Sequence, residues 1–267
     1  MEKEYSMNKT QQASDKEEKR TVHIFWTGGY DSTFRVTQLS QKNVNIAPYY
    51  LKFRRQSTPN ELEAMEKITN LLKQNPKTKC TFSPLQVIDA EEYTVDPAIK
   101  QAYKRIRETM YVGSQYVKLA SYALNHPGFE LSVHKDDKAI AVINAQGKLK
   151  KIEDEEIGTY YIVDQENSSE DVCTMFSNFC FPLTDITKLQ MKQWYIENGY
   201  EEVMNSTWFC HKPRNGKPCG VCNPCKYTIE EGMKERLPKR ALIRYYIKYS
   251  PVSKTVRKLV RKVVPAK

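Results

Sequence analysis

The sequence lacks any run of about 18 apolar residues, the length that indicates a membrane-spanning helix. Its first 20 residues are polar and of mixed charge, so they also lack the apolar stretch of a secretory signal. We therefore expect a cytoplasmic protein in which residues 1–20 form a flexible arm. With 267 residues, 40% of them hydrophobic, the chain can build one large domain or two small ones around a core.

Acidic residues are nearly absent from the C-terminal segment 234–267. The segment carries twelve Lys or Arg and one acid, a net charge of +11, which leaves a net −1 for the rest of a chain of formal charge +10. Apolar residues within 256–263 fall on one face of an expected helix. A basic amphipathic helical tail suits an anionic membrane surface, nucleic-acid phosphates or a partner, and it also suits a helix packed on the body with a solvated outer face.

Short apolar strands alternate with amphipathic helices along most of the chain. The expected strands are 21–26, 43–53, 80–89 and 129–134. The expected helices are 31–42, 58–76, 96–125 and 184–200. Asn60 is the expected cap of the second helix, the third is broken near Gly113, and the fourth is capped by Thr184 or Asp185 and ends near Gly199. This order predicts an α/β domain over 21–207 with a doubly wound, mostly parallel sheet. Residues 138–164 are β-rich around a glycine-containing turn at 145–147, which predicts an inserted β-hairpin.

The turn after the first strand contains neither the lysine of a Walker loop nor the third glycine of a dinucleotide fingerprint. It reads Thr27, Gly28, Gly29, Tyr30, Asp31, Ser32, Thr33. A glycine-rich strand-to-helix turn aims backbone N–H groups into one concavity at the positive end of a helix, where phosphate oxygens bind. The hydroxyls of Thr27 and Ser32 add donors, and Asp31 is placed to help hold Mg²⁺. The alternative is a tight turn in which Asp31 is only an N-cap.

Seven cysteines occur without a secretion signal, so disulfides are not expected. Cys80, Cys173 and Cys180 are scattered and are interpreted as buried thiols. The other four follow the pattern C-x8-C-x2-C-x2-C, as Cys210, Cys219, Cys222 and Cys225. Four thiolates predict a closed, structural Zn²⁺ site with no open position. An iron–sulfur cluster would take the same four ligands, and His211 could replace Cys210.

The glycine turn resembles the SGGxDS signature of the PP-loop ATP pyrophosphatases, with Thr27 in place of the first serine. Together with the cysteine cluster it is similar to the 7-cyano-7-deazaguanine synthase family, which has a C-terminal zinc site. "PLTDITKLQM" (182–191), with Lys188, and "CGVCNPC" (219–225) resemble further segments of that family. The resemblance covers about residues 21–233, and it implies a Rossmann-like PP-loop domain, a zinc-binding module at 208–233 and a homodimer.

The resemblance also implies a reaction. ATP would activate a carboxylate as an acyl-adenylate, ammonia would displace AMP to give an amide, and a second ATP would convert that amide to a nitrile. The implied ligands are ATP, Mg²⁺ and structural Zn²⁺, with a deazapurine carboxylate as substrate and ammonia as nitrogen donor. Asp31 and Lys188 are the expected catalytic residues, and the alternative for Lys188 is a solvated lysine in the first turns of a helix.

The chain departs from the family pattern between these two motifs. Ser114 and Gln115 stand where the family has Arg-Asn, and "SVHKDDKA" (132–139) replaces its Tyr-Pro-Asp-Cys-Arg stretch. We therefore take Gln115, His134 and Asp137 as candidate substrate residues. The differences leave open an adenylating enzyme that acts on a protein, a nucleic acid or a surface-polymer precursor. A third reading is a non-catalytic zinc-ribbon protein that binds nucleic acid and retains a vestigial ATP loop.

Overall fold

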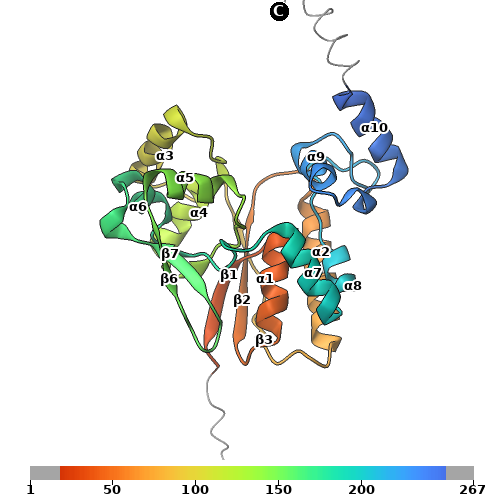
Figure 1. Cartoon of the computed structure of the whole chain (residues 1–267), viewed down its shortest axis with the longest axis horizontal. Coiled ribbons are helices and arrows are strands. Elements are labelled where there is room, and N and C mark those ends of the chain that lie inside the picture. Colours follow the sequence, from red (N-terminus) through yellow and green to blue (C-terminus); the bar gives the residue numbers. More distant parts are fainter. Residues whose placement is uncertain (1–18, 251–267) are drawn as a thin grey trace, which may run out of the picture.

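A computed structural model describes residues 19–250, which form a six-stranded parallel sheet between two layers of helices (Figure 1). The strand order is β3-β2-β1-β5-β8, and β4 also pairs with β2. The strands are β1 (Thr21–Phe25), β2 (Asn45–Lys52), β3 (Thr81–Phe82), β4 (Gln86–Asp89), β5 (Phe129–Glu130) and β8 (Phe179–Cys180). Every pair in this sheet is parallel, so the expected doubly wound α/β fold is confirmed.

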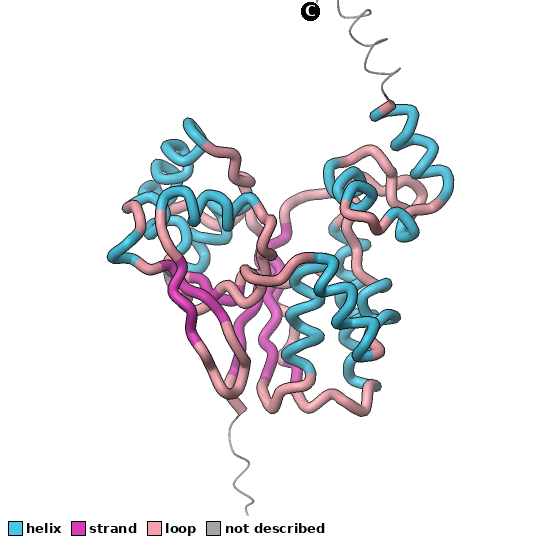
Figure 2. Tube along the Cα trace, viewed as in Figure 1, coloured by secondary structure: helices cyan, strands magenta, loops and turns pink. Residues whose placement is uncertain are grey.

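One helical layer lies on each face of the sheet (Figure 2). The first comprises α1 (Tyr30–Ser40), α2 (Thr58–Gln74), α7 (Lys188–Asn198) and α8 (Glu201–Asn205), and the second comprises α3 (Pro97–Thr109), α4 (Gln115–Leu124), α5 (Lys138–Gln146) and α6 (Glu170–Phe176). Neighbouring residues of β1 serve opposite cores, because side chains alternate along a strand. Ile24 packs with the first layer and Phe25 with the second.

The C-terminal part of the described chain forms a separate small unit above the first layer (Figure 1). It contains α9 (Asn223–Glu230) and α10 (Lys239–Tyr249), with the short 3₁₀ helix η2 (Lys234–Arg236) between them. A second 3₁₀ helix, η1 (Gln165–Asn167), lies in the body, between β7 and α6. The basic tail is therefore helical over part of its length, while 251–267 and its expected apolar face lie outside the described residues, as do residues 1–18 of the expected arm. No helix within 19–250 is long and apolar enough to cross a membrane.

Element boundaries differ from expectation where tertiary contacts decide them. The third strand is interrupted at 83–85, and the fourth ends at Glu130. Helix α2 begins at Thr58 as expected, but its N-cap is Ser57 instead of Asn60, and α7 begins after Thr187, whose hydroxyl and Gln190 form a capping box. The expected caps Asn60, Thr184 and Asp185 are therefore wrong, whereas Gly199 ends α7 in the left-handed conformation.

The inserted hairpin is shorter than expected, and its turn lies elsewhere. Residues 138–146 form α5, while the antiparallel hairpin consists of β6 (Leu149–Ile152) and β7 (Tyr160–Val163) with its turn at 153–159. The Asp137 carboxylate caps α5 by accepting a hydrogen bond from Ala139 N (2.8 Å). The apolar residues at 139, 140, 142 and 143 are buried, which is the spacing of one helix face. This helical burial overrides the β propensity of the segment.

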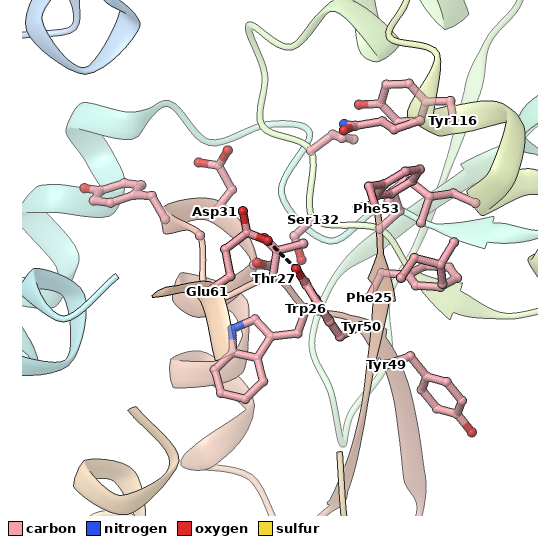
Figure 3. A pocket seen from close by; sticks show the side chains of 18 of the residues that line it. Phe25, Trp26, Thr27, Asp31, Tyr49, Tyr50, Phe53, Glu61, Tyr116 and Ser132 are labelled. Carbon is pink, nitrogen blue, oxygen red and sulfur yellow. Dashed lines mark hydrogen bonds between the residues drawn. The ribbon is translucent and has the colours of Figure 1, made fainter. Parts of the chain in front are cut away.

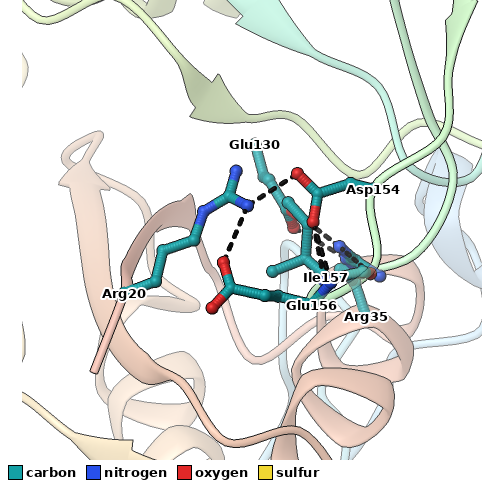
Figure 4. A network of polar contacts seen from close by, with 6 residues as sticks. All are labelled: Arg20, Arg35, Glu130, Asp154, Glu156 and Ile157. Carbon is teal, nitrogen blue, oxygen red and sulfur yellow. Dashed lines mark hydrogen bonds and ion pairs between the residues drawn. The ribbon is translucent and has the colours of Figure 1, made fainter. Parts of the chain in front are cut away.

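Ion pairs fasten the hairpin to the sheet (Figure 4). Arg35 of α1 forms a bidentate ion pair with Glu130 of β5, in which the two nitrogen–oxygen distances are 2.8 and 2.5 Å. The same guanidinium also donates a hydrogen bond to Ile157 O in the hairpin turn. Both side chains of this pair are at most 5% exposed. Arg20 binds Asp154 (2.6 Å) at the surface of the same turn.

We expect Glu130→Ala to lower the free energy of unfolding by about 3–5 kcal/mol, because it leaves the Arg35 charge buried without a partner. Urea unfolding followed by circular dichroism measures the effect. Glu153→Ala is the matched control, since it removes an exposed ion pair with Lys151 and should leave the unfolding midpoint unchanged. Equal stability of the two variants would contradict the structural role of the buried pair.

The strand order reverses at β1, because the chain proceeds from β1 through β2 in one direction and reaches β5 on the other side. Crevices at such a reversal, beyond the carboxyl ends of the strands, are where open α/β sheets bind ligands. The glycine turn follows β1, and residues 131–134 follow β5. Topology thus brings these two segments to the same edge of the sheet.

Candidate functional site

The glycine turn is shaped as much by packing as by any ligand. Gly28 has φ +65°, and a Cβ there would lie 2.9 Å from Glu61 O and 3.0 Å from Met65 Cγ on α2. Only glycine combines this backbone conformation with such a close approach of α2. The sequence explained Gly28 by the approach of a phosphate, and the structure adds the close packing of α2 as a second reason for glycine at this position.

The N-terminus of α1 opens beside this turn. The N-cap is Gly29, which has no side chain to satisfy the first N–H groups of the helix. Asp31 lies inside the first turn and does not cap it, so the N-cap interpretation of Asp31 is wrong. One carboxylate oxygen, Oδ2, lies 3.4 Å from His134 Nδ1. The other, Oδ1, is buried without a hydrogen-bond partner among the described residues.

Three basic side chains lie around Asp31, namely His134, Lys188 and Arg236. Burial raises the pKa of its carboxyl, but contact with His134 and the charges of Lys188 and Arg236 outweigh this, so the pKa lies below its usual value. For His134, burial lowers the pKa, yet contact with Asp31 raises it more. Burial also lowers the pKa of Lys188, but the charges of Asp31 and Glu231 raise it more, so this pKa lies above its usual value. The surrounding basic groups therefore favour the ionised form of Asp31.

A cavity of about 220 Å³ lies against this turn (Figure 3). Asp31 and Glu61 lie on one side of it, and Phe25, Phe53 and Tyr116 on the other. Phe25, Phe53 and Tyr116 form an aromatic wall, and Trp26 and Tyr50 add further rings beside Glu61 (Figure 3). An aromatic wall close to acidic and hydroxyl groups suits a ligand that carries both a planar ring and charged groups.

Seven of the expected site residues line this cavity, whereas Gly28, Thr33, His134 and Lys188 do not. Those that line it are Thr27, Gly29, Tyr30, Asp31, Ser32, Gln115 and Asp137. Gln115 accepts a hydrogen bond from Arg55 (3.3 Å), and Asp137 accepts one from Tyr116 (3.1 Å) in addition to capping α5. The Thr33 side chain is fully buried, and its hydroxyl accepts a hydrogen bond from Trp26 Nε1 (3.0 Å), so its position indicates a structural role.

Lys188 is neither free nor simply solvated. Its ammonium pairs with Glu231 at the end of α9 (2.9 Å), and its side chain is 19% exposed. This pair joins the first helix layer to the cysteine-rich unit.

Several residues beside the turn carry no local sequence signal. Glu61 is buried and accepts hydrogen bonds from Tyr50 and Ser57, both at 2.6 Å. Arg236 donates to Thr207 O (2.9 Å), and its guanidinium lies over the rings of Tyr30 (5.4 Å) and Phe209 (4.9 Å). These side chains come from distant segments, so only the assembled fold places them.

The four clustered cysteines form a compact group of sulfurs. All four Sγ atoms lie within 4.8 Å of one another, and the Cys219–Cys225 and Cys210–Cys222 separations are both 3.9 Å. Four sulfurs at about 2.3 Å from one tetrahedral ion stand about 3.8 Å apart. The backbone N–H groups of Cys219, Val221 and Cys222 point at these sulfurs, as suits thiolates. The geometry is consistent with zinc, and His211 is not a member of the group.

Helix α10 packs directly on the cysteine loop. Gly220 has φ +79°, and a Cβ there would lie 2.0 Å from Ala241 O. Arg244 of α10 also donates to Cys219 O (2.7 Å). The cysteine loop and α10 therefore form one packed unit.

We expect Gly220→Ala to destabilise this unit strongly. The left-handed conformation alone costs about 1–2 kcal/mol for alanine, and the clash adds about 1–3 kcal/mol by displacing α10. Gly216→Ala is the matched control. Gly216 has φ +67°, and a Cβ there would have no neighbour within 4 Å, so this variant should show only the cost of the left-handed conformation. Thermal unfolding and limited proteolysis after Arg236 compare the two variants. A Gly220→Ala protein as stable as the control would contradict the packing.

The cysteine-rich unit is hydrogen-bonded to the glycine turn. Trp208 N donates to Gly28 O (2.8 Å), and the Trp208 indole donates to Cys210 O (2.8 Å). One tryptophan thus connects the sulfur cluster to the end of β1. The glycine turn is therefore in direct contact with the cysteine-rich unit.

Comparison with known proteins bears on the whole of this arrangement. The family model described as "Queuosine biosynthesis protein QueC" matches residues 20–235. The match extends from the start of β1 into η2, so it covers the four clustered cysteines and both sides of the cavity and ends before α10. A search of curated proteins found no match to the chain.

Proposed function

Because the chain belongs to the QueC family of the PP-loop superfamily, we propose that it is an AMP-forming ligase that adenylates a carboxylate or amide oxygen. The family supports an ATP-dependent enzyme of queuosine biosynthesis. The observation that carries the finer proposal is the junction at the carboxyl end of β1. There an uncapped helix N-terminus, the carboxylate of Asp31 and an aromatic wall share one cavity.

The phosphates of ATP would bind at the start of α1. The turn from Thr27 to Ser32 offers backbone N–H groups and two hydroxyls, and the helix dipole favours negative charge there. Lys188, beside Asp31, would offset the charge that develops when pyrophosphate leaves. Asp31 would hold Mg²⁺ through its unpartnered Oδ1, since carboxylate oxygens are the ligands that this ion prefers. When bound, Mg²⁺ would further neutralise the phosphates.

The chemistry needs a good leaving group. A carboxylate oxygen attacks the α-phosphorus of ATP, pyrophosphate leaves, and the resulting acyl-adenylate releases AMP when ammonia attacks its carbonyl carbon. If the amide oxygen is adenylated in a second round, loss of AMP gives a nitrile. The site's contribution is to align the two reactants and to exclude water from the adenylate.

The acceptor would lie toward the aromatic wall. Tyr116 and Phe53 offer ring faces for a planar heterocycle, and Gln115 and Asp137 offer hydrogen-bonding groups beside them. A deazapurine carboxylate fits this chemistry. Gln115, Ser132 and Asp137 belong to the segments that depart from the family pattern, so a protein, nucleic-acid or surface-polymer acceptor is the alternative.

The test is AMP and pyrophosphate formation from Mg-ATP by the purified full-length protein. It is measured with and without 7-carboxy-7-deazaguanine and ammonium. AMP that appears only with both additions, with a nitrile by mass spectrometry, is the expected result. AMP formation without that dependence would assign a different acceptor. A protein that does not bind ATP would overturn the proposal and favour the zinc-ribbon reading.

A further inference from the structure

Helix α10 exposes an apolar face. Ile243, Tyr246 and Ile247 are 57%, 55% and 67% exposed, and the spacing of three and four residues puts them on one side of the helix. The opposite side carries Ala241, which is fully buried against the cysteine loop. Figure 1 shows α10 at the outer end of the molecule, away from the sheet. Adjoining exposed apolar side chains of this kind are typical of a surface that binds another protein or a membrane.

A basic cavity adjoins the same helix. It has a volume of about 930 Å³, and no acidic residue lines it. Its five cationic side chains come from the cysteine loop and from α10: Arg214, Lys217, Lys239, Arg240 and Arg244. Within 19–250 none of the five forms an ion pair with a carboxylate. Arg244 instead donates to backbone carbonyls of Cys219 and Pro218, which holds it in place.

The charged and apolar features meet on one surface. Arg240 precedes Ile243 by three residues and Ile247 by seven, so it continues the apolar face toward the N-terminus of α10. Lys239 is its neighbour, and both side chains are exposed. The surface thus offers isoleucines and a tyrosine beside a group of cations that have no acidic partner in the described chain.

We propose that this surface of α10 and the loop 213–217 docks on an anionic membrane. The apolar face would enter the boundary between headgroups and acyl chains, and the cations would lie at lipid phosphates. A nucleic acid would satisfy the cations but leave two exposed isoleucines without apolar contact. A second copy of the chain would bring two such cation groups together. Residues 251–267 follow α10 directly and carry six more Lys or Arg and no acid, which adds to the attraction.

The experiment is co-sedimentation of the full-length zinc-bound protein with large vesicles. Neutral phosphatidylcholine vesicles are compared with vesicles that contain about 30% phosphatidylglycerol, at about 0.1 M salt. We expect binding to the anionic vesicles that is at least about ten-fold tighter than to the neutral ones and that weakens as salt rises. Absence of binding to anionic vesicles would overturn the proposal.

Two pairs of substitutions test the two features separately. Ile243→Ser with Ile247→Ser should weaken vesicle binding by about ten-fold or more, through lost apolar burial. Lys239→Gln with Arg240→Gln should weaken it by about 25-fold, from about five-fold for each charge near the surface. Matched controls elsewhere on the body are Tyr111→Ser, at a side chain 63% exposed, and Lys100→Gln with Lys104→Gln on α3. Zinc content and thermal unfolding establish that each variant is folded.

Two results would assign the surface to another occupant. The first is tight binding of an oligonucleotide at the same salt, with vesicle binding unaffected by the isoleucine substitutions. The second is a dimer in sedimentation analysis that the isoleucine substitutions convert to a monomer. Either result overturns membrane docking. The vesicle assay is independent of ATP turnover, so its failure leaves the proposed ligase reaction untouched.

Discussion

The Asp31→Asn protein should lose AMP formation by about 10²–10³-fold while it remains folded. Asparagine has nearly the same shape as aspartate, so the first turn of α1 is preserved. The lost feature is the negative charge that His134, Lys188 and Arg236 surround. Without it the site loses the buried, unpartnered Oδ1 that would hold Mg²⁺, while Glu61 and Asp137, the other carboxylates that line the cavity, already accept hydrogen bonds.

The measurement is the rate of AMP release at saturating Mg-ATP, together with nucleotide affinity in the presence and absence of Mg²⁺. We expect the variant to keep affinity for free ATP, since its cations and helix N-terminus remain, but to lose the gain that Mg²⁺ brings. Asp136→Asn is the control, because Asp136 is an exposed carboxylate beside the same segment and does not line the cavity. A variant at position 31 with the native rate would remove Asp31 from the catalytic proposal.

Loss of the metal should have the second large effect. Structural zinc contributes roughly 10–16 kcal/mol of apparent binding free energy in small zinc domains. We therefore expect Cys225→Ser to abolish stoichiometric zinc binding and to unfold the unit that carries α9 and α10. Cys225 is fully buried within the sulfur group, so a serine hydroxyl there cannot replace its ligand strength.

Activity should fall with the metal even though zinc touches no reactant. The folded unit positions Trp208 against Gly28 and Glu231 against Lys188. When the unit unfolds, the glycine turn loses a hydrogen bond and Lys188 loses its partner. Metal analysis, tryptophan fluorescence and AMP formation should change together in Cys225→Ser and after chelation.

The control for this series is Cys173→Ser, at a half-buried cysteine on α6 that lies outside the sulfur group. It should keep zinc, stability and activity. Iron in place of zinc, with visible absorbance, would overturn the zinc assignment and support the iron–sulfur alternative. Full AMP formation by a metal-free protein would show that the cysteine-rich unit does not position the glycine turn.

The sequence by itself determined the fold class and the two motifs. Alternating apolar strands and helices predict a parallel sheet, because strand and helix periods are local properties of the chain. The glycine turn and the cysteine spacing are equally local, since each lies within a short segment. For the same reason Gly199 could be recognised as the end of α7.

Tertiary structure decided the elements whose local pattern fits two periods. Residues 138–146 contain alanines and isoleucines that suit a strand or a helix, and the Asp137 cap together with burial of one face selects the helix. The strand at 80–89 is divided because β2 pairs with it at two separate places. Such choices depend on what lies opposite each segment.

The surroundings of Asp31 were also beyond the reach of sequence. His134 follows β5, Lys188 begins α7 and Arg236 ends η2, and only the strand order and the folded cysteine-rich unit bring them together. Glu61 and Trp208 reach the glycine turn in the same way. Local spacing therefore identifies the chemistry of a motif, while the charges that act on it are set by packing between segments distant along the chain.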